Sequence, residues 1–173
     1  DPSNIRNILE YGGGSLLDIG CYLIHLSRML MGSEPTGIKA SVQRDPESGV
    51  DTTTAGILEF GNKVATFTCS TRVEPNQRVD IYGSKGRISI EIPFNIPVDR
   101  PTRIMVTAGG NPPTEPATKT IEFEPVNQYT LQAEAFAAAV LDGESVPDSG
   151  LNVADNIRVI DRLFAAAGPS GWS

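Results

Sequence analysis

The chain has 173 residues, of which 39% are hydrophobic and 20% are charged, as is typical of a globular domain with a sizeable core. It carries 14 Lys and Arg against 21 Asp and Glu, a net charge of −7, which disfavours a nucleic-acid partner because phosphate binding needs basic side chains gathered on one surface. No apolar run approaches the roughly 18 residues that a membrane span needs. Two cysteines, Cys21 and Cys69, form no disulfide framework, so we expect free thiols and a cytoplasmic location.

The first residues, at positions 1–4, include no initiator Met and resemble the interior of a longer protein. We therefore expect residues 1–173 to be one domain of a larger chain.

The first predicted element is a helix over residues 15–31. Apolar residues recur there at three- and four-residue spacing, which is typical of a helix with a buried face. Ser15 is expected to cap this helix, with Asp18 as the acidic member of a capping box. Gly32 is the expected end.

Between residues 37 and 124 the pattern changes to short segments of alternating and β-branched residues, which predict strands. Seven are expected, over residues 38–42, 52–60, 63–72, 78–82, 87–92, 103–107 and 118–123. Gly61-Asn62 and the segment 83–86 are predicted hairpin turns. Residues 108–117 form a loop rich in Pro and Gly.

Two further helices are predicted over residues 129–141 and 152–167, with a turn region at 143–150 and a frayed tail after Gly168. One helix, then a run of strands, then more helices is the signature of an α+β fold. We expect an open, mostly antiparallel sheet of about seven strands with helices on one face.

Polar residues on the first helix are the main candidates for chemistry. Gly12-Gly13-Gly14 allows a tight turn or a close backbone approach before the helix. Asp18, Tyr22 and His25 are spaced by four and three residues, so they share one stripe. An acid, a phenol and an imidazole can together orient a hydroxylated ligand and move a proton. The alternative is that this stripe is only the solvent face of the helix, with Asp18 favoured there by the helix dipole.

The same segment resembles a signature of the glucose-fructose oxidoreductase/inositol dehydrogenase (Gfo/Idh/MocA) family. In that family a triple-glycine loop leads into a helix carrying Asp-x-Gly-x-His or Asp-x-Gly-x-Tyr, and here the motif is Asp18-Ile19-Gly20-Cys21-Tyr22. Residues 4–6, 81–86 and 127–129 are also similar to the family's C-terminal domain. Tyr at position 22 resembles the glucose-fructose oxidoreductase and dihydrodiol or xylose dehydrogenase branch more than the inositol branch.

The resemblance implies a substrate-binding and oligomerisation domain of an NAD- or NADP-dependent oxidoreductase that acts on a sugar or polyol. It implies catalytic roles for Asp18 and Tyr22, and we expect Arg6, Gly13 and His25 to bind substrate. It also implies a homo-oligomer, with a dimer built sheet to sheet. One His and two distant Cys predict no metal site.

Two family features are missing from this sequence. No Gly-x-Gly-x-x-Gly follows a strand and opens a helix, and no Lys precedes Pro as in the family's Glu-Lys-Pro motif. We therefore expect the Rossmann domain to be absent from this chain, the cofactor-binding residues to lie elsewhere, and the chain alone to be inactive. The alternative is a non-catalytic assembly or sugar-binding module, which an upstream dinucleotide fingerprint would argue against.

Overall fold

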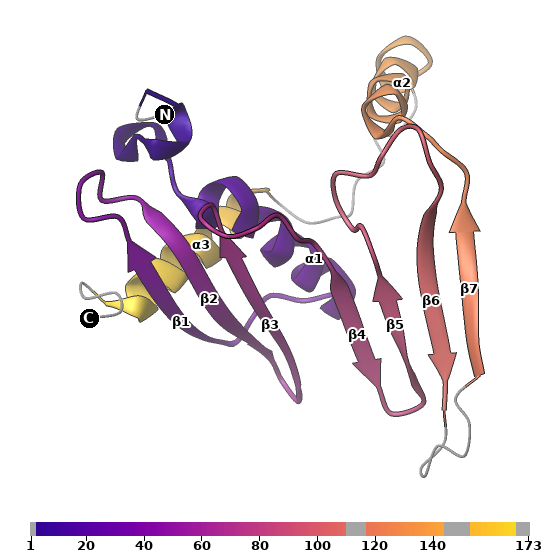
Figure 1. Cartoon of the computed structure of the whole chain (residues 1–173), viewed down its shortest axis with the longest axis horizontal. Helices are drawn as coiled ribbons and strands as arrows, with labels where there is room; N and C mark the ends of the chain where they lie inside the picture. The colour runs from indigo at the N-terminus through magenta and orange to yellow at the C-terminus, as the bar shows by residue number, and fades with distance from the viewer. Residues whose placement is uncertain (1–2, 110–116, 144–152, 169–173) are drawn as a thin grey trace. The chain divides into compact units, whose positions relative to one another are not determined.

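The structure is a computed structural model that describes residues 3–109, 117–143 and 153–168. The chain divides into two compact units, one of residues 1–74 with 148–173 and one of residues 75–147 (Figure 1). Within the described residues, the seven predicted strands and three long helices are all present, so the α+β class is confirmed.

The strands are divided between two antiparallel sheets rather than joined in one. One sheet has the order β1-β2-β3 and the other the order β4-β5-β6-β7. The first sheet ends where residues 71–78 leave strand conformation. This connection contains Pro75, which has no N–H to donate to a ladder and therefore interrupts pairing.

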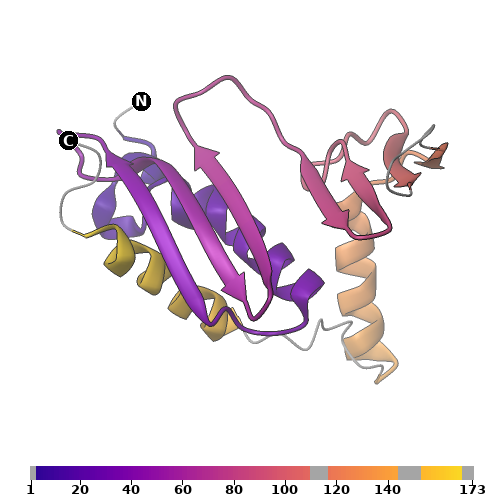
Figure 2. The same ribbon diagram turned by 90° about the horizontal axis from the view of Figure 1, so that it is seen from below.

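The first sheet consists of β1 (Gly37–Arg44), β2 (Asp51–Phe60) and β3 (Lys63–Ser70). The predicted Gly61-Asn62 hairpin is confirmed, and Gly61 takes the left-handed conformation with φ 63°. Helices α1 (Cys21–Met31) and α3 (Val153–Ala167) both lie on one face of this sheet (Figure 2). That arrangement confirms the expectation of helices on a single face for this unit.

The predicted first helix has an irregular start. A π-helical turn, η3 (Leu16–Gly20), precedes the regular α1. The end at Gly32 is confirmed, with φ 67° and its N–H bonded to the Arg28 carbonyl. The predicted capping box is wrong, because the Ser15 side chain makes no cap hydrogen bond and instead donates to Asp51.

The core of the first unit lies between the sheet and its two helices. Its buried members are Leu16, Ile24, Leu58, Phe60, Cys69, Val159, Ile160 and Leu163. Burying a large apolar side chain contributes about 1.5–3 kcal/mol, so this cluster is the main source of stability for the unit. Gly20 lets the helix approach β3 closely, because a Cβ there would lie 3.1 Å from the Cys69 sulfur.

A buried arginine joins the two helices. Arg28 is fully buried, pairs with Glu34 at 2.6 Å and donates to the Asn156 side-chain oxygen at 3.2 Å. Asn156 in turn donates to the Cys21 carbonyl at 3.1 Å. This network fixes α1 against α3 through polar contacts that apolar periodicity does not reveal.

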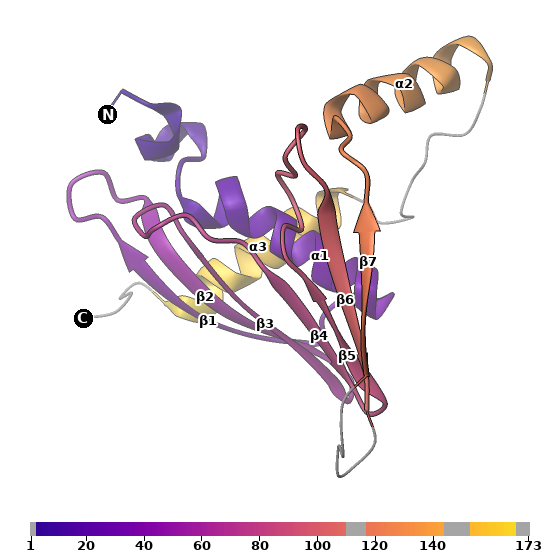
Figure 3. The ribbon, with the colours of Figure 1, turned by 45° about the vertical axis from the view of Figure 1, so that its right-hand side comes forward.

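The second unit contains β4 (Val79–Gly83), β5 (Gly86–Ile90), β6 (Thr102–Ala108), β7 (Ala117–Phe123) and α2 (Gln128–Leu141), as Figure 3 shows. Asn127 caps α2 by accepting the N–H groups of Tyr129 and Thr130. No residue of α2 is buried. The unit is thus a four-stranded meander followed by an exposed helix.

Parts of four sequence predictions lie outside the described residues. These are the loop at 110–116, most of the turn region at 143–150, the first residue of the helix predicted over 152–167 and the tail from residue 169 onward. Within the described ranges, no helix has both the length and the apolar character that crossing a membrane would require.

Candidate active site

The glycine turn folds back onto the segment before it. Short 3₁₀ turns η1 (Ile5–Asn7) and η2 (Leu9–Tyr11) lead into it. The Gly13 N–H donates to the Ile8 carbonyl at 3.0 Å, and the Gly14 N–H donates to the Arg6 carbonyl at 2.9 Å. A Cβ at Gly13 would lie 2.6 Å from the Arg6 carbonyl oxygen. The close approach that requires glycine here is therefore to the chain's own backbone.

This turn brings two of the predicted site residues together. Arg6 Nε donates to Asp18 Oδ2 at 2.8 Å, joining η1 to the π-helical turn. The side chains are 57% and 31% exposed, so both remain accessible to a ligand. The Asp18 N–H also donates to the Gly14 carbonyl at 3.2 Å, which ties the Asp18 backbone to the glycine turn.

Tyr22 and His25 follow along the same helical run. Tyr22 lies in the first turn of α1 and is 55% exposed, so a large part of its side chain is in contact with solvent. His25 is half-buried one turn further on. An accessible phenol within a turn of an accessible carboxylate is an arrangement that can bind and polarise a hydroxyl group.

Asp51 is a buried acid that the sequence patterns did not single out. It is 1% exposed, and its Oδ2 accepts hydrogen bonds from Ser15 Oγ at 2.6 Å, from the Leu16 N–H at 2.8 Å and from Thr54 Oγ1 at 2.8 Å. The helix start is thus held by a carboxylate from β2 rather than by its own Ser15. The signal in the sequence was an acid directly after Val50 at the start of a strand.

Both thiols are kept protonated near neutral pH. Burial raises the pKa of the Cys69 thiol from its ordinary value of 9.0 to about 11. Burial likewise raises the pKa of Cys21. Because the thiolate is the nucleophile, these cysteines are poorly suited to covalent chemistry.

Metal chemistry has no visible basis in the described part of the chain. Residues 3–109, 117–143 and 153–168 contain no group of three or more His, Cys, Asp or Glu side chains that could hold a metal ion. The polar side chains of this segment and its helix that could bind a ligand are the Arg6 guanidinium, the Asp18 carboxylate, the Tyr22 phenol and the His25 imidazole.

The described residues form an α+β domain in which a glycine turn leads into a helical run that carries Asp18 and Tyr22. Residues 1–89 match the GFO/IDH/MocA C-terminal domain, and the chain belongs to this family. The predicted resemblance is therefore confirmed.

Relatives of known sequence support the same assignment. An uncharacterized oxidoreductase, ORF334, of Rhizobium meliloti is 34% identical over 99% of this chain and 52% of its own length. D-xylose 1-dehydrogenase (NADP(+)) 2 of Haloferax volcanii is 27% identical over 95% of this chain and 49% of its own. The chain thus spans about half the length of these relatives.

A solved structure confirms the fold. KijD10, a 3-ketoreductase from Actinomadura kijaniata crystallised with NADP and TDP-benzene, superimposes with a TM-score of 0.78. The match covers 94% of this chain and 49% of that one, at 22% sequence identity.

Proposed function

We propose that this chain is the substrate-binding and oligomerisation domain of an NAD(P)-dependent oxidoreductase that acts on a hydroxyl or carbonyl group of a sugar or polyol. The observation that carries the proposal is the Arg6–Asp18 pair at 2.8 Å, one turn before the exposed Tyr22. Relatives named as sugar-acting, NADP-dependent dehydrogenases support the substrate and cofactor class.

The donors and acceptors on this helix suit a neutral, hydroxylated substrate. The Asp18 carboxylate accepts a hydrogen bond from a substrate hydroxyl, and the pairing with Arg6 holds that carboxylate in one orientation. Tyr22 donates to or accepts from the reacting oxygen and takes part in moving its proton. His25 and the exposed part of Arg6 bind further hydroxyls.

This chain's glycine turn does not fit a nicotinamide dinucleotide. The N–H groups of Gly13 and Gly14 are bonded to the carbonyls of Ile8 and Arg6, so they are not available to phosphate oxygens. Because the chain also spans only about half the length of its relatives, we propose that cofactor binding lies in a part of the whole protein outside residues 1–173. When bound there, the nicotinamide supplies or accepts the hydride of the reaction.

The test compares the full-length protein with residues 1–173 alone. We expect the full-length protein to reduce NADP⁺ or NAD⁺ with D-xylose or a related sugar or polyol, and to bind NADPH in a fluorescence titration. Residues 1–173 alone are expected to do neither. Micromolar NADPH affinity in residues 1–173 would contradict the assignment of the cofactor site, and an inactive full-length protein across a broad sugar panel would contradict the enzymatic proposal.

The assembly role rests on one face of the second sheet. The ladders align Val79, Ile90, Ile104 and Ile121 in one row, and Ile81, Ile88 and Val106 in the next row of the same face. Paired residues of an antiparallel sheet point to the same side, so these side chains form an apolar face, and Lys119, which pairs with Val106, lies at its β7 edge. None of them is buried. A second copy of the chain covering this face is the basis of the proposed homodimer.

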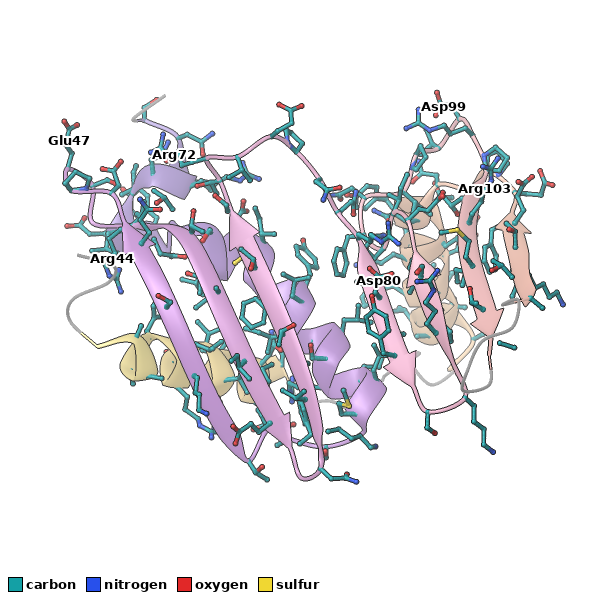
Figure 4. All side chains as sticks on the ribbon, turned by 60° about the horizontal axis from the view of Figure 1, so that its bottom comes forward. Arg44, Glu47, Arg72, Asp80, Asp99 and Arg103 are labelled. Atoms are coloured by element: carbon teal, nitrogen blue, oxygen red, sulfur yellow. The ribbon has the colours of Figure 1, made fainter. Side chains whose placement is uncertain are left out.

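The opposite face of the same sheet is polar, which makes the apolar face distinctive. Asp80 accepts hydrogen bonds from Ser89 and Arg78, and Arg103 pairs with Glu122 at 3.1 Å. Figure 4 labels Asp80 and Arg103 on this sheet. The Ser89 hydrogen bond, followed by the one from Arg78, lowers the pKa of the Asp80 carboxyl. This face carries its own charge pairs, while Ser89 and Thr107 on it are buried and Met105 also lies there.

A further inference from the structure

An irregularity in β2 turns the Asp51 side chain toward the start of the helix. In a regular strand, residues three apart point to opposite faces. Asp51 and Thr54 nevertheless meet, with Thr54 Oγ1 donating to Asp51 Oδ2 at 2.8 Å. The pairing of β1 with β2 shifts register between Gln43 and Arg44, opposite this point. A bulge of this kind re-aims a side chain, and here it turns Asp51 to the face that carries the helices.

The Asp51 carboxylate contacts polar groups at the start of the helix. Its Oδ2 receives Ser15 Oγ and the Leu16 N–H in addition to Thr54 Oγ1. On the other side, Asp51 Oδ1 lies against Gly14, where a Cβ would collide with it. Among the ion pairs found in the described residues, none involves Asp51. The buried acid is therefore satisfied by two hydroxyls and by the Leu16 N–H at a helix start, an environment that favours negative charge.

The contacts continue directly to the candidate catalytic residues. Gly14, which packs on Asp51, accepts the Asp18 N–H at 3.2 Å. Tyr22 follows four residues later in the same helical run. A π-helical turn is a less regular segment than an α-helix and is frequent at functional sites. The geometry of this π-helical turn therefore depends on the hydrogen bonds that Ser15 and Leu16 make to Asp51.

We propose that Asp51 is a positioning residue for Asp18 and Tyr22: its carboxylate fixes the first turn of the π-helical segment, and thereby fixes where these two side chains meet the substrate. This inference rests on the proposed function, because that function gives Asp18 and Tyr22 their role. A misplacement of about 1 Å at reacting groups can cost on the order of 100-fold in rate. Loss of the Asp51 hydrogen bonds is therefore expected to lower kcat.

The experiment uses the full-length protein with Asp51→Asn, Asp51→Ala and Ser15→Ala. Asp51→Asn can keep one acceptor oxygen in place but puts an amide group against Gly14. Asp51→Ala removes the acceptor entirely. Ser15→Ala removes a single donor to the Asp51 carboxylate. Val42→Ala is the matched control, because Val42 is 1% exposed in β1 but lies outside the core cluster that contains Leu16. Val42 pairs with Thr54 across β1 and β2, but its apolar side chain makes none of the Asp51 hydrogen bonds. Val42→Ala is therefore expected to lower the melting temperature and to leave those hydrogen bonds in place.

We expect kcat to fall about 10- to 100-fold in Asp51→Asn, further in Asp51→Ala and less in Ser15→Ala, with KM changed only a few-fold. Val42→Ala is expected to keep kcat within about twofold at a comparable loss of melting temperature. If kcat in the Asp51 and Ser15 variants follows melting temperature along the same line as Val42→Ala, the positioning role is overturned. Ser15→Ala decides the question if Asp51→Ala does not fold.

A second readout is independent of activity. Hydrogen–deuterium exchange of residues 15–22 is expected to be faster in Asp51→Asn and Ser15→Ala than in Val42→Ala. Unchanged exchange in this segment would overturn the inference even if the enzyme is active. A wild-type protein that turns over no sugar would instead count against the proposed function, while the exchange result still decides whether Asp51 holds the helix start.

Discussion

Arg6 and Asp18 form an ion pair in which Arg6 Nε lies 2.8 Å from Asp18 Oδ2, bridging two segments separated by the glycine turn. Exposed pairs of this kind contribute only about 0–1 kcal/mol to stability. A pair that is weak for stability and accessible to solvent is well placed for a functional role.

The first prediction concerns this pair in the full-length enzyme. Asp18→Asn and Arg6→Gln should each lower kcat/KM by at least tenfold while changing the free energy of unfolding by less than about 1 kcal/mol. If the two side chains act as one unit, the double variant should lose little more activity than Asp18→Asn alone. Steady-state kinetics and urea unfolding on the three variants measure this. Fully additive losses would show that Arg6 and Asp18 act independently.

The second prediction concerns the phenol. Tyr22→Phe keeps the ring and removes the hydroxyl, so kcat/KM should fall by roughly 10²–10⁴-fold, the usual span for a positioned acid or base. Melting temperature should be nearly unchanged, because the side chain is 55% exposed. Tyr82→Phe is the matched control, since Tyr82 is 74% exposed in the second unit and should keep full activity. Equal kcat/KM values in Tyr22→Phe and Tyr82→Phe would contradict a catalytic role for Tyr22.

The third prediction concerns backbone strain and crowding together at the glycine turn. Gly14 and Gly61 both have positive φ, at 122° and 63°. A Cβ at Gly14 would collide with the Asp51 carboxylate, whereas a Cβ at Gly61 would meet nothing within 4 Å. Gly61→Ala should therefore cost only strain, about 1–2 kcal/mol, and Gly14→Ala should cost clearly more. Chemical unfolding of the two variants measures the difference, and similar losses would mean that Asp51 moves aside freely.

The fourth prediction tests the apolar face of the second sheet. Ile121 and Thr120 are neighbours on β7, are both exposed and point to opposite faces. Ile121→Lys should weaken dimerisation at least tenfold, about 1.4 kcal/mol, because it places a charge on the apolar face. Thr120→Lys adds the same charge to the polar face and should leave the dimer intact.

Light scattering over a range of protein concentrations measures both variants against the wild type. A wild-type protein that remains monomeric at high concentration would rule out the dimer, and equal weakening by both lysines would rule out this face as its interface.

The fifth prediction concerns pH and the buried thiol. The raised pKa of Cys69 means that the folded state keeps a proton that the unfolded state loses above about pH 9. Its stabilising contribution is therefore complete below pH 9 and is lost as pH rises toward 11. The loss should be roughly 2–3 kcal/mol across that window. Unfolding of the wild type and Cys69→Ala at pH 8, 9, 10 and 11 measures it, because other titrating groups are common to both proteins. If the free energies of unfolding of the two proteins change in parallel with pH, the raised pKa of Cys69 is contradicted.

The sequence by itself determined the positions of the secondary structure. In the described part of the chain, apolar spacing and β-branched runs located each strand and long helix to within a few residues, and Gly32 and Gly61 ended their elements as expected. These features succeed because periodicity and left-handed glycine conformations are local properties of a few neighbouring residues. The motif around Asp18 and Tyr22 indicated the family because it, too, is a pattern of neighbouring residues.

The tertiary structure alone decided how these elements are held together. The division into two sheets depends on which strands hydrogen-bond to one another, which no single strand encodes. Asp51 faces the helices only because pairing with β1 shifts its register, and a strict alternation of residues cannot anticipate that shift. The Arg6–Asp18 pair likewise exists because the glycine turn folds the chain back on itself. Contacts between distant residues arise from packing and strand register, so they become visible only when the chain is folded.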